Sequence, residues 1–444
     1  GMVAAMARAL ERHGTIGLAR ALAPAIALAR DGFEIDYYLA LAIASCADRL
    51  WPHPESKRVF FKAGGLPPRP ALGLEAADRV AQPDLARTLE TIAGEGPGAL
   101  YRGNLARAIV DDVRANGGLL TLDDLASYRV RELAPLDGRY RGRRVLTLPE
   151  TAGGITVIEA LHVLDGLDLG ALEQSGARSL HLLAEAQRRA FLDRLAYLHD
   201  PAFGPSPFAA LASREYADAI RARIDPERAD VNAGPGPVAA FAPEAVAAAS
   251  PSGGARPDDV PHTTHICAVD AERTLVSLTS TLGQGFGSGV VPAGTGIVMA
   301  DVMTWFDPEA GRASSIAPGK RILWAPAPAV VLQDDRPLLA VGAPGGRKLI
   351  SAVLQTIVNV VDHGDAPQDA VNRPRVHCEG RETWIDARVR ADVRDALAAM
   401  GHELVVLEET LSSTWFGRPN AILVDGDVLR AGVNRLKPSL AAGW

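Results

Sequence analysis

The feature that most constrains this chain is an interruption near its middle. Residues 226–262 are rich in proline, glycine and alanine, and they contain the run Ser250-Pro-Ser-Gly-Gly-Ala-Arg-Pro257. Such a composition offers little apolar surface to bury, so we expect this segment to be flexible. The run Thr263-Thr-His-Ile-Cys-Ala-Val-Asp270 follows directly and alternates like a β-strand. This order is typical either of an ordinary linker between domains or of a place where the chain is cut.

The two sides of the interruption differ in the secondary structure that they predict. Between Met2 and about Arg114, apolar residues recur at three- and four-residue spacing, which indicates helices. A strand is predicted at Tyr140–Leu148 and an amphipathic helix at Ser179–Leu198. After the interruption, Thr264–Val269 and Thr274–Leu282 predict the two strands of a hairpin. The front of the chain is therefore mostly helical, and strands become frequent behind it.

Length and composition exclude several classes of protein. With 444 residues, one large domain or two interlocked domains are expected. The 53 acidic and 46 basic residues are spread along the chain, which argues against a nucleic-acid-binding face. Cys46, Cys267 and Cys378 are far apart and are predicted to be buried thiols rather than parts of a disulfide framework or a zinc site. No apolar run of membrane-spanning length and no signal segment is found, so we expect no membrane interaction and slightly favour the cytoplasm over the periplasm or secretion.

Thr263 is the residue whose chemistry the interruption would serve. A threonine freed at the N-terminus of a strand carries nucleophile and base together, because its hydroxyl attacks while its own α-amine takes the proton. The chain is therefore predicted to cut itself between His262 and Thr263. Thr281, at the end of the partner strand, is placed to orient the Thr263 hydroxyl. The predicted reaction is cleavage of an amide bond through an acyl-enzyme, and it requires no metal and no cofactor.

Two glycine-rich stretches follow the predicted hairpin. Gly283–Gly289 fails the spacing of a dinucleotide fingerprint and does not lead into a helix, so no nucleotide site is expected there. A short strand at Leu338–Gly342 leads through an Ala-Pro-Gly-Gly turn into a helix predicted at 347–363. Unpaired N–H groups at a helix start favour an anion, so Gly345 and Gly346 are predicted to hold an oxyanion. The alternative is a tight turn that only requires small residues.

Further motifs along the chain are typical of one family. In chain order they are Ala29-Arg-Asp-Gly-Phe33, Gly117-Gly-Leu119, Gly153-Gly-Ile155, Thr263-Thr-His265, Pro318-Gly-Lys-Arg321, Gly342-Ala-Pro-Gly-Gly346 and Asn372-Arg-Pro-Arg375. Over most of its length the chain resembles the gamma-glutamyltransferase family of N-terminal nucleophile hydrolases. The resemblance implies an α+β fold, the αββα four-layer sandwich, in which two stacked and mainly antiparallel sheets lie between helical layers.

The resemblance also implies roles for individual residues. Thr263 would attack the peptide bond after His262 by an N-to-O acyl shift and afterwards attack the substrate. Thr281 stands where the family has a second threonine that hydrogen-bonds the nucleophile. Gly345 and Gly346 stand where the family has the two glycines of the oxyanion hole.

Self-cleavage would divide the chain into two portions. Residues 1–262 would form a mostly helical large-subunit portion that ends in the flexible segment 226–262. Residues 263–444 would form the small subunit with the catalytic threonine at its N-terminus. The resemblance implies that the two portions stay associated and build one intertwined domain, and it is compatible with a homodimer of this heterodimer.

The positions that bind a γ-glutamyl group in the family differ in this chain. The family has an Asn, an acid and a serine pair where this chain has Gly283, Trp305 and Trp324-Ala325. With Arg347 and Asp301, these residues are the expected substrate-binding set. Burying the charged end of a glutamyl group without polar partners is costly, which favours a more apolar acyl group or one without the amino group.

Three functions are compatible with these residues. The first is cleavage or transfer of an acyl group of the γ-glutamyl or glutathione type from a small-molecule amide to water or an amine. The second is an amidohydrolase or acylase with a different acyl specificity. The third is an inactive relative that keeps the scaffold and acts in binding.

The charged residues near the predicted site have two interpretations each. Arg347 would pair either with a substrate carboxylate or with a structural acid. Asp301 and Asp307 would either replace the missing acid or be solvated loop charges. His262 and His265 project to opposite faces of a strand, which favours local shaping of the site over a zinc pair.

Two differences in length from the family affect the expectations. The loop between Phe306 and Lys320 is short, so the pocket is expected to open to water on that side, which would favour hydrolysis over transfer. A family segment that supplies strands of the central sheet and an Arg that binds the substrate carboxylate comes before the position of Gly1. Either that segment is missing from the sequence or the protein does without it.

Overall fold

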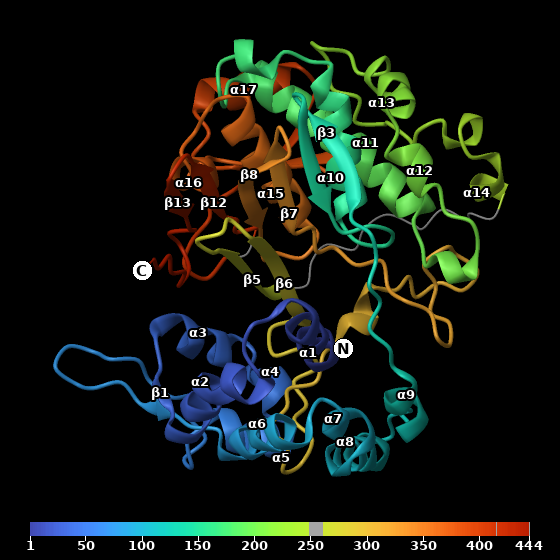
Figure 1. Ribbon diagram of the computed structural model, residues 1–444. Coiled ribbons are helices and arrows are strands. Elements are labelled where there is room, and N and C mark those ends of the chain that lie inside the picture. The colour runs from blue at the N-terminus through green and yellow to red at the C-terminus, as the bar shows by residue number, and fades with distance from the viewer. Residues whose placement is uncertain (248–260, 414, 444) are drawn as a thin grey trace. The chain divides into compact units, whose positions relative to one another are not determined.

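The structure is a computed structural model that describes residues 1–247, 261–413 and 415–443 (Figure 1). The chain divides into two compact units, which we call the helical unit (Gly1–Leu133 and Leu282–Asp301) and the sandwich unit (Ala134–Thr281 and Val302–Trp444). Each unit therefore contains residues from both sides of Thr263. The predicted division at Thr263 does not coincide with the boundary between the units, and cleavage there stays a prediction.

The helical unit confirms the helices predicted for the front of the chain. Its helices are α1 (Met2–His13), α2 (Leu18–Asp31), α3 (Tyr37–Ser45), α4 (Ala47–Leu50), α5 (Pro54–Phe60), α6 (Pro83–Glu95), α7 (Gly98–Arg102), α8 (Asn104–Ala115) and α9 (Leu122–Ser127), with two short strands, β1 (Phe33–Glu34) and β2 (Arg79–Val80). The apolar faces of α3, α4 and α5 contribute to a small core that includes Ile43, Leu50 and Phe60. Helices of this kind are stabilised mainly by such burial of one face.

The segment Leu282–Asp301 belongs to the core of the helical unit although it follows the hairpin in sequence. Arg49 Nη1 donates to the carbonyl oxygens of Gly285 and Gly287 at 3.3 and 3.1 Å. Ser56 Oγ donates to the carbonyl oxygen of Gly289 at 2.5 Å, and a Cβ on Gly289 would lie only 2.7 Å from the carbonyl oxygen of Arg49. The glycines of this stretch thus serve close backbone packing.

The sandwich unit is built on a six-stranded sheet in which every neighbouring pair is antiparallel. Its strands, in spatial order, are β13 (Val428–Gly432), β12 (Asn420–Asp425), β8 (Arg336–Gly342), β7 (Ala329–Gln333), β4 (Arg143–Thr147) and β3 (Leu136–Tyr140). The strand predicted at Tyr140–Leu148 is confirmed as β4 over Arg143–Thr147, but its predicted start was wrong. Tyr140 ends β3, and Arg141 and Gly142 adopt positive φ angles of 50° and 76° and turn the chain back on itself.

Helices cover one face of this sheet (Figure 1). The buried helices are α10 (Gly154–Asp165), α11 (Ala177–Tyr197) and α15 (Lys348–Val361). A second, three-stranded sheet of β9 (Val376–His377), β10 (Glu382–Asp386) and β11 (Glu403–Leu407) lies beyond them with α17 (Ala391–Ala399). The other helices of the unit are α12 (Phe208–Leu211), α13 (Arg214–Arg221), α14 (Pro243–Ala247) and α16 (Pro367–Asn372).

Helix α11 differs from the amphipathic helix predicted at Ser179–Leu198. It packs against α10 on one side and against α17 and β9 on the other, so it is buried on nearly all sides. Its charged residues are buried too: Arg188 Nε donates to Glu185 at 2.9 Å, and both side chains are fully inaccessible. Charges that suggested a solvated face are instead paired inside the protein, as buried charges must be.

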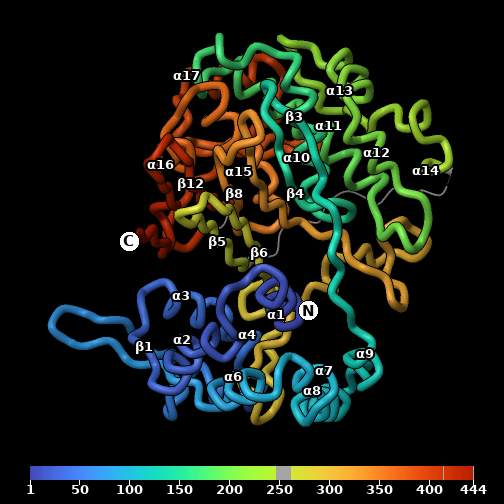
Figure 2. The backbone as a smooth tube through the Cα atoms, viewed as in Figure 1, coloured from blue at the N-terminus to red at the C-terminus, as the bar shows by residue number. Residues whose placement is uncertain are grey.

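The predicted hairpin is confirmed and forms the second layer of the sandwich. Strands β5 (Pro261–Val269) and β6 (Leu275–Gln284) pair with each other, and β5 packs against β8 and β12 (Figures 1 and 2). Leu339 and Val341 of β8 join the apolar core, so the alternating residue Gly342 faces the opposite side. There a Cβ on Gly342 would lie 2.0 Å from Cε1 of His265. Two sheets with helices on the outer face confirm the predicted α+β sandwich.

The proline- and glycine-rich segment 226–262 differs from the predicted flexible tether over its described part. The Gly236 N–H donates to Asp193 Oδ1 at 2.5 Å, and the Gly236 carbonyl oxygen accepts from the Tyr197 hydroxyl at 3.3 Å. Val238 and Ala245 are buried. Residues 226–247 are therefore fixed in place by a clamped glycine and small apolar side chains. The run 250–257 lies outside the described residues.

Two expectations from composition can be compared with the structure. All three cysteines are free thiols, but only Cys378 is buried, whereas Cys46 and Cys267 are half-buried. The prediction of three buried thiols was thus wrong for two of them: Cys46 lies at the margin of the helical unit's core, and Cys267 lies on β5. Among the helices that the structure describes, none is both long and apolar enough to cross a bilayer.

Candidate active site

A chain of hydrogen bonds links Thr263 to the peptide bond in front of it. The hydroxyl of Thr263 donates to Oγ1 of Thr281 at 3.0 Å. The hydroxyl of Thr281 donates in turn to the carbonyl oxygen of His262 at 3.1 Å. The antiparallel hairpin brings these side chains together because facing residues of paired strands have adjacent Cβ atoms. The chain of bonds thus begins at the predicted nucleophile and ends on the carbonyl of the predicted cleavage site.

His265 supports the same hairpin from the next cross-strand position. Its Nδ1 lies 2.8 Å from the Thr279 hydroxyl, and its backbone carbonyl accepts from Asn420 Nδ2 at 3.1 Å. Burial lowers the pKa of His265 to about 4, so the ring is neutral near neutral pH. His265 therefore holds β5 against β8 and β12, which agrees with the predicted shaping role. Because side chains alternate along a strand, Thr263 faces the same side as His265.

Gly345 and Gly346 form a strained turn between β8 and α15. Their φ angles are 138° and 58°, and a Cβ on Gly345 would lie 2.6 Å from the Cα of Gly417. Gly345 therefore requires glycine, and the positive φ of Gly346 favours it. Neither N–H donates to an acceptor within the described part of the chain. The turn thus combines the two alternatives considered from the sequence, because it needs small residues and it also leaves two backbone donors available to an oxyanion.

Arg347 pairs with a structural acid that the sequence did not single out. Its Nε lies 2.9 and 3.0 Å from the two carboxylate oxygens of Glu379, and His377 Nε2 lies 3.2 Å from the same carboxylate. Although burial opposes ionisation, Arg347 and His377 hold the pKa of Glu379 well below its usual value. Of the two alternatives for Arg347, the structure therefore shows pairing with a structural acid. These residues are about thirty positions apart in sequence, so no local signal could have identified the pair.

Trp324 is fixed by a buried arginine that the sequence also did not identify. Nη2 of Arg194 donates to the Trp324 carbonyl oxygen at 2.8 Å, and the Trp324 N–H donates to the Thr151 carbonyl oxygen at 2.9 Å. Burial and the nearby Arg347 lower the pKa of Arg194 to about 9. The backbone on which the Trp324 indole is carried is thus held rigidly within the sandwich unit.

The predicted substrate-binding residues are divided between the two units. Trp305, Trp324 and Arg347 belong to the sandwich unit, and both indoles are half-buried. Gly283 and Asp301 belong to the helical unit, where Asp301 Oδ1 accepts from the Gln284 N–H at 2.9 Å and lies 3.8 Å from Arg49 at its other oxygen. Their joint role in binding a substrate stays a prediction.

Asp307 is not a solvated loop charge. Its side chain is only 10% exposed and lies 3.5 Å from Arg312. Its N–H also donates to the Ser314 carbonyl oxygen at 2.9 Å. The loop after Trp305 is therefore held by ion pairing and backbone bonds, although the openness of the pocket beside it stays a prediction.

The chain is similar to known proteins over its whole length. The family model described as Gamma-glutamyltranspeptidase matches residues 1–444. The Acylase ACY 1 proenzyme of Pseudomonas sp. (strain SE83) is 38% identical over 406 residues, which is 91% of this chain and 68% of that protein. The Glutathione hydrolase proenzyme of Escherichia coli (strain K12) is 33% identical over 464 residues, covering 100% of this chain and 74% of that protein.

A solved structure shares the fold. The crystal structure of cephalosporin acylase from Bacillus halodurans matches with a TM-score of 0.85 and 27% identity, covering 99% of this chain and 77% of that one. The curated relatives named above are thus an acylase proenzyme and a glutathione hydrolase proenzyme. From the sandwich, the paired threonines and these matches, it follows that the chain belongs to the gamma-glutamyltranspeptidase family of N-terminal nucleophile hydrolases.

Proposed function

We propose that this chain is the precursor of an amide hydrolase that cuts its own backbone before Thr263. The observation that carries the proposal is the pair of hydrogen bonds from Thr263 through Thr281 to the carbonyl oxygen of His262. When Oγ1 of Thr263 attacks the His262 carbonyl carbon, negative charge develops on an oxygen that already accepts from Thr281. Stabilisation of that charge lowers the barrier to attack.

Self-cleavage requires no reactant other than water. The bond from Thr263 Oγ1 to the His262 carbonyl carbon forms, and the peptide C–N bond breaks. The proton from the Thr263 hydroxyl ends on the freed α-amine. Water then hydrolyses the ester, which leaves a carboxylate on His262 and a free threonine at the new N-terminus.

The freed Thr263 would then act on an external amide. Its α-amine takes the hydroxyl proton while Oγ1 attacks the amide carbonyl, and the N–H groups of Gly345 and Gly346 stabilise the oxyanion. Departure of the amine leaves an acyl ester on Thr263. Water releases the acyl group as an acid, whereas an amine acceptor would take it by transfer.

We infer that the preferred acyl group lacks the charged α-amino acid end of a γ-glutamyl group. Gly283 and Trp305 supply no charge for such an end, and neither does the rigidly held Trp324. The 38% identity with an acylase supports this specificity. A γ-glutamyl group is the second candidate, because a glutathione hydrolase is 33% identical over the whole chain.

Two measurements test the proposal in turn. After purification and incubation, a denaturing gel with N-terminal sequencing is expected to reveal fragments of 262 and 182 residues that together account for the 444. A wild-type chain that stays whole would overturn self-cleavage. Turnover of a glutaryl anilide is then compared with turnover of a γ-glutamyl anilide. Preference for the glutaryl group supports the inferred specificity, and preference for the γ-glutamyl group replaces it with the second candidate.

A further inference from the structure

The short segment Phe416–Arg418 lies against the turn that carries the proposed oxyanion donors. It directly precedes β12, and the antiparallel register of β12 with β8 ends where Asn420 stands opposite Gly342. Two residues further along the same register, the Arg418 N–H donates to the Pro344 carbonyl oxygen at 2.9 Å. The pairing of β8 with its neighbour thus continues past the end of the sheet and into the turn.

Gly417 is the residue of this segment that touches the turn. The same register places it opposite Gly345, and a Cβ on Gly345 would lie 2.6 Å from the Gly417 Cα and 3.3 Å from its backbone nitrogen. Hydrogen-bonded and non-hydrogen-bonded pairs alternate along an antiparallel ladder, and the backbones approach most closely at pairs of the second kind. The contact therefore fixes the position of Gly345 and leaves its N–H without an acceptor among the described residues.

Gly417 also touches the helix that begins after the turn. A Cβ on Gly417 would lie 2.8 Å from each of three atoms at the start of α15, namely the Lys348 carbonyl oxygen, the Leu349 Cα and the Ala352 Cβ. Two of these atoms belong to the backbone, which cannot move aside as a flexible side chain can. Gly417 is thus packed between Gly345 and α15, so it fixes the way in which β8 and α15 are joined.

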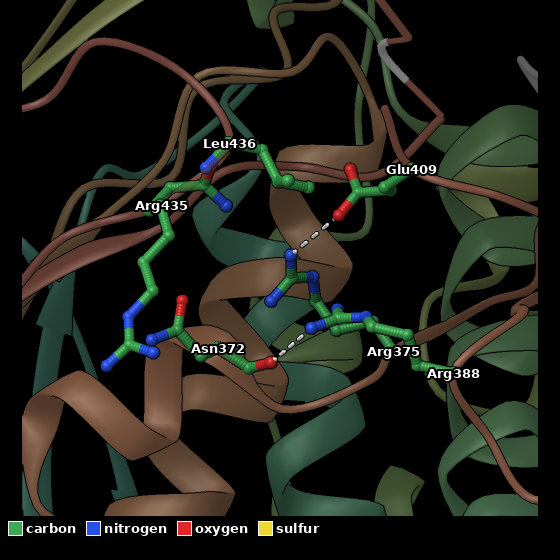
Figure 3. A pocket seen from close by; sticks show the side chains of 7 residues that line it. Asn372, Arg375, Arg388, Glu409, Arg435 and Leu436 are labelled. Atoms are coloured by element: carbon green, nitrogen blue, oxygen red, sulfur yellow. Dashed lines mark hydrogen bonds and ion pairs between the residues drawn. The ribbon is translucent and has the colours of Figure 1, made fainter. Parts of the chain in front are cut away.

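The segment is anchored by the side chains on both sides of Gly417. Phe416 is 2% exposed and Arg418 is 7% exposed. The Arg418 guanidinium lies close enough to Glu409 to interact with its charge, and Figure 3 shows Glu409 joined to Arg375, whose Nη2 lies 3.4 Å from the carboxylate. A buried side chain on each side leaves the Gly417 backbone little freedom to move away from the turn.

We propose that Gly417 is a positioning residue for the Gly345–Gly346 turn and holds the two N–H groups in the direction in which they meet the oxyanion of an external amide. This inference rests on the proposed function. Donors that are fixed in advance stabilise a transition state because they need not reorient while the charge develops. A misplacement of about 1 Å can lower a rate about 100-fold, so the packing behind the turn affects catalysis.

The positioning role separates the two reactions of Thr263. In self-cleavage, the negative charge develops on the His262 carbonyl oxygen, which accepts from the Thr281 hydroxyl at 3.1 Å. In turnover of an external amide, the charge develops on the substrate oxygen that faces the Gly345–Gly346 turn. A change at Gly417 is therefore expected to slow amide turnover and to leave the rate of self-cleavage close to that of the wild type.

Gly417→Ala tests this separation in the full-length chain, with Gly432→Ala as the matched control. A Cβ on Gly432, which lies on β13, would also meet backbone, at 2.3 Å from the Pro367 carbonyl oxygen. Self-cleavage is followed on denaturing gels, and kcat and KM are measured per cleaved chain on the anilide that the wild type prefers.

The two variants are expected to differ in kcat. Gly417→Ala should lower kcat about 10- to 100-fold and change KM little, because the displaced donors act on the transition state. Its self-cleavage should proceed at nearly the wild-type rate. Gly432→Ala should lose stability but keep kcat per cleaved chain. This pattern would not result from a purely structural role of Gly417, which would affect both reactions alike.

A milder variant covers the case in which Gly417→Ala does not fold. Phe416→Leu keeps a buried apolar side chain but packs the segment less tightly, so a smaller loss in kcat with unchanged self-cleavage is expected. Wild-type kcat in every variant of the segment that folds, or equal slowing of both reactions, would overturn the proposal. If only Gly345→Ala lowers kcat, the positioning role alone is wrong. Full turnover in Gly345→Ala would remove the oxyanion role of the turn, and the positioning role with it.

Discussion

Two glycine-rich turns of this chain have similar compositions and opposite uses of their backbone. In Gly283–Gly289, the N–H groups of Gly287 and Gly289 donate to the carbonyl oxygens of Gln284 and Phe286 at 2.9 and 2.8 Å, and the carbonyls accept from Arg49 and Ser56. In the Gly345–Gly346 turn, neither N–H has an acceptor among the described residues. The number of glycines therefore does not identify an anion site, but the accounting of backbone donors does.

The largest expected effect comes from removing Thr263, the nucleophile whose oxyanion the Gly345–Gly346 turn would stabilise. Thr263→Ala is expected to abolish self-cleavage, because no hydroxyl remains to attack the His262 carbonyl. Thr263→Ser keeps the hydroxyl and is the matched control, which should still cleave. Intact mass and N-terminal sequencing after incubation distinguish the outcomes, and fragments from Thr263→Ala that begin at residue 263 would contradict the assignment.

The two turns themselves can be compared by placing a Cβ in each. Gly345→Ala is expected to lower amide turnover about 100- to 1,000-fold, because it displaces an oxyanion donor. Gly287→Ala introduces similar strain, with a Cβ 2.1 Å from the Met299 carbonyl oxygen, and should lower stability but keep turnover per folded molecule. Turnover normalised to the folded fraction measures the difference. Equal losses in both variants would break the comparison.

Thr281 tests the side-chain donor that self-cleavage is proposed to use, in contrast to the backbone donors of the second turn. Thr281→Val removes the donor to the His262 carbonyl oxygen and is expected to slow self-cleavage about 100-fold. Thr281→Ser retains the hydroxyl and should cleave at a rate close to that of the wild type. A time course on denaturing gels gives both rates, and a valine variant as fast as the serine variant would show that Thr281 is dispensable.

The smallest expected effect concerns acid. His265, which packs on Gly342 beside the second turn, has a folded-state pKa of about 4, below the value of about 6.5 for an unfolded histidine. The unfolded chain thus binds the proton first, so this contribution to stability is complete above about pH 6.5 and is lost as the pH falls toward 4. It amounts to about 3 kcal/mol at most.

Urea unfolding at pH 7.5 and pH 5 measures this contribution. The free energy of unfolding is expected to be lower at pH 5, and His265→Gln should reduce the difference. A variant with the same pH dependence as the wild type would assign the acid sensitivity to other buried histidines, such as His402, whose pKa burial and His181 lower to about 3.

Local patterns of sequence predicted the elements that carry the candidate site better than they predicted the environment of individual charges. The hairpin and the strand–turn–helix at Gly345 depend on alternation, glycine and helical periodicity, which short stretches encode. The burial of Glu185 and Arg188 on α11 does not depend on a local pattern. It results from the packing of α17 and β9, which come from elsewhere in the chain. The break at Arg141 was missed because Tyr-Arg-Gly lacks the strong signal of an Asn-Gly or Asp-Gly turn.

The composition of the two units has a consequence for the fate of the cleaved protein. Residues 282–301 complete the core of the helical unit, and residues 134–247 supply strands β3 and β4 and helices α10 and α11 of the sandwich unit. After cleavage, each fragment would therefore contribute residues to both hydrophobic cores. The two fragments could not dissociate like subunits that meet at a surface, because separation would expose both interiors. The persistence of the heterodimer would be set by the rate of unfolding rather than by an affinity between folded partners.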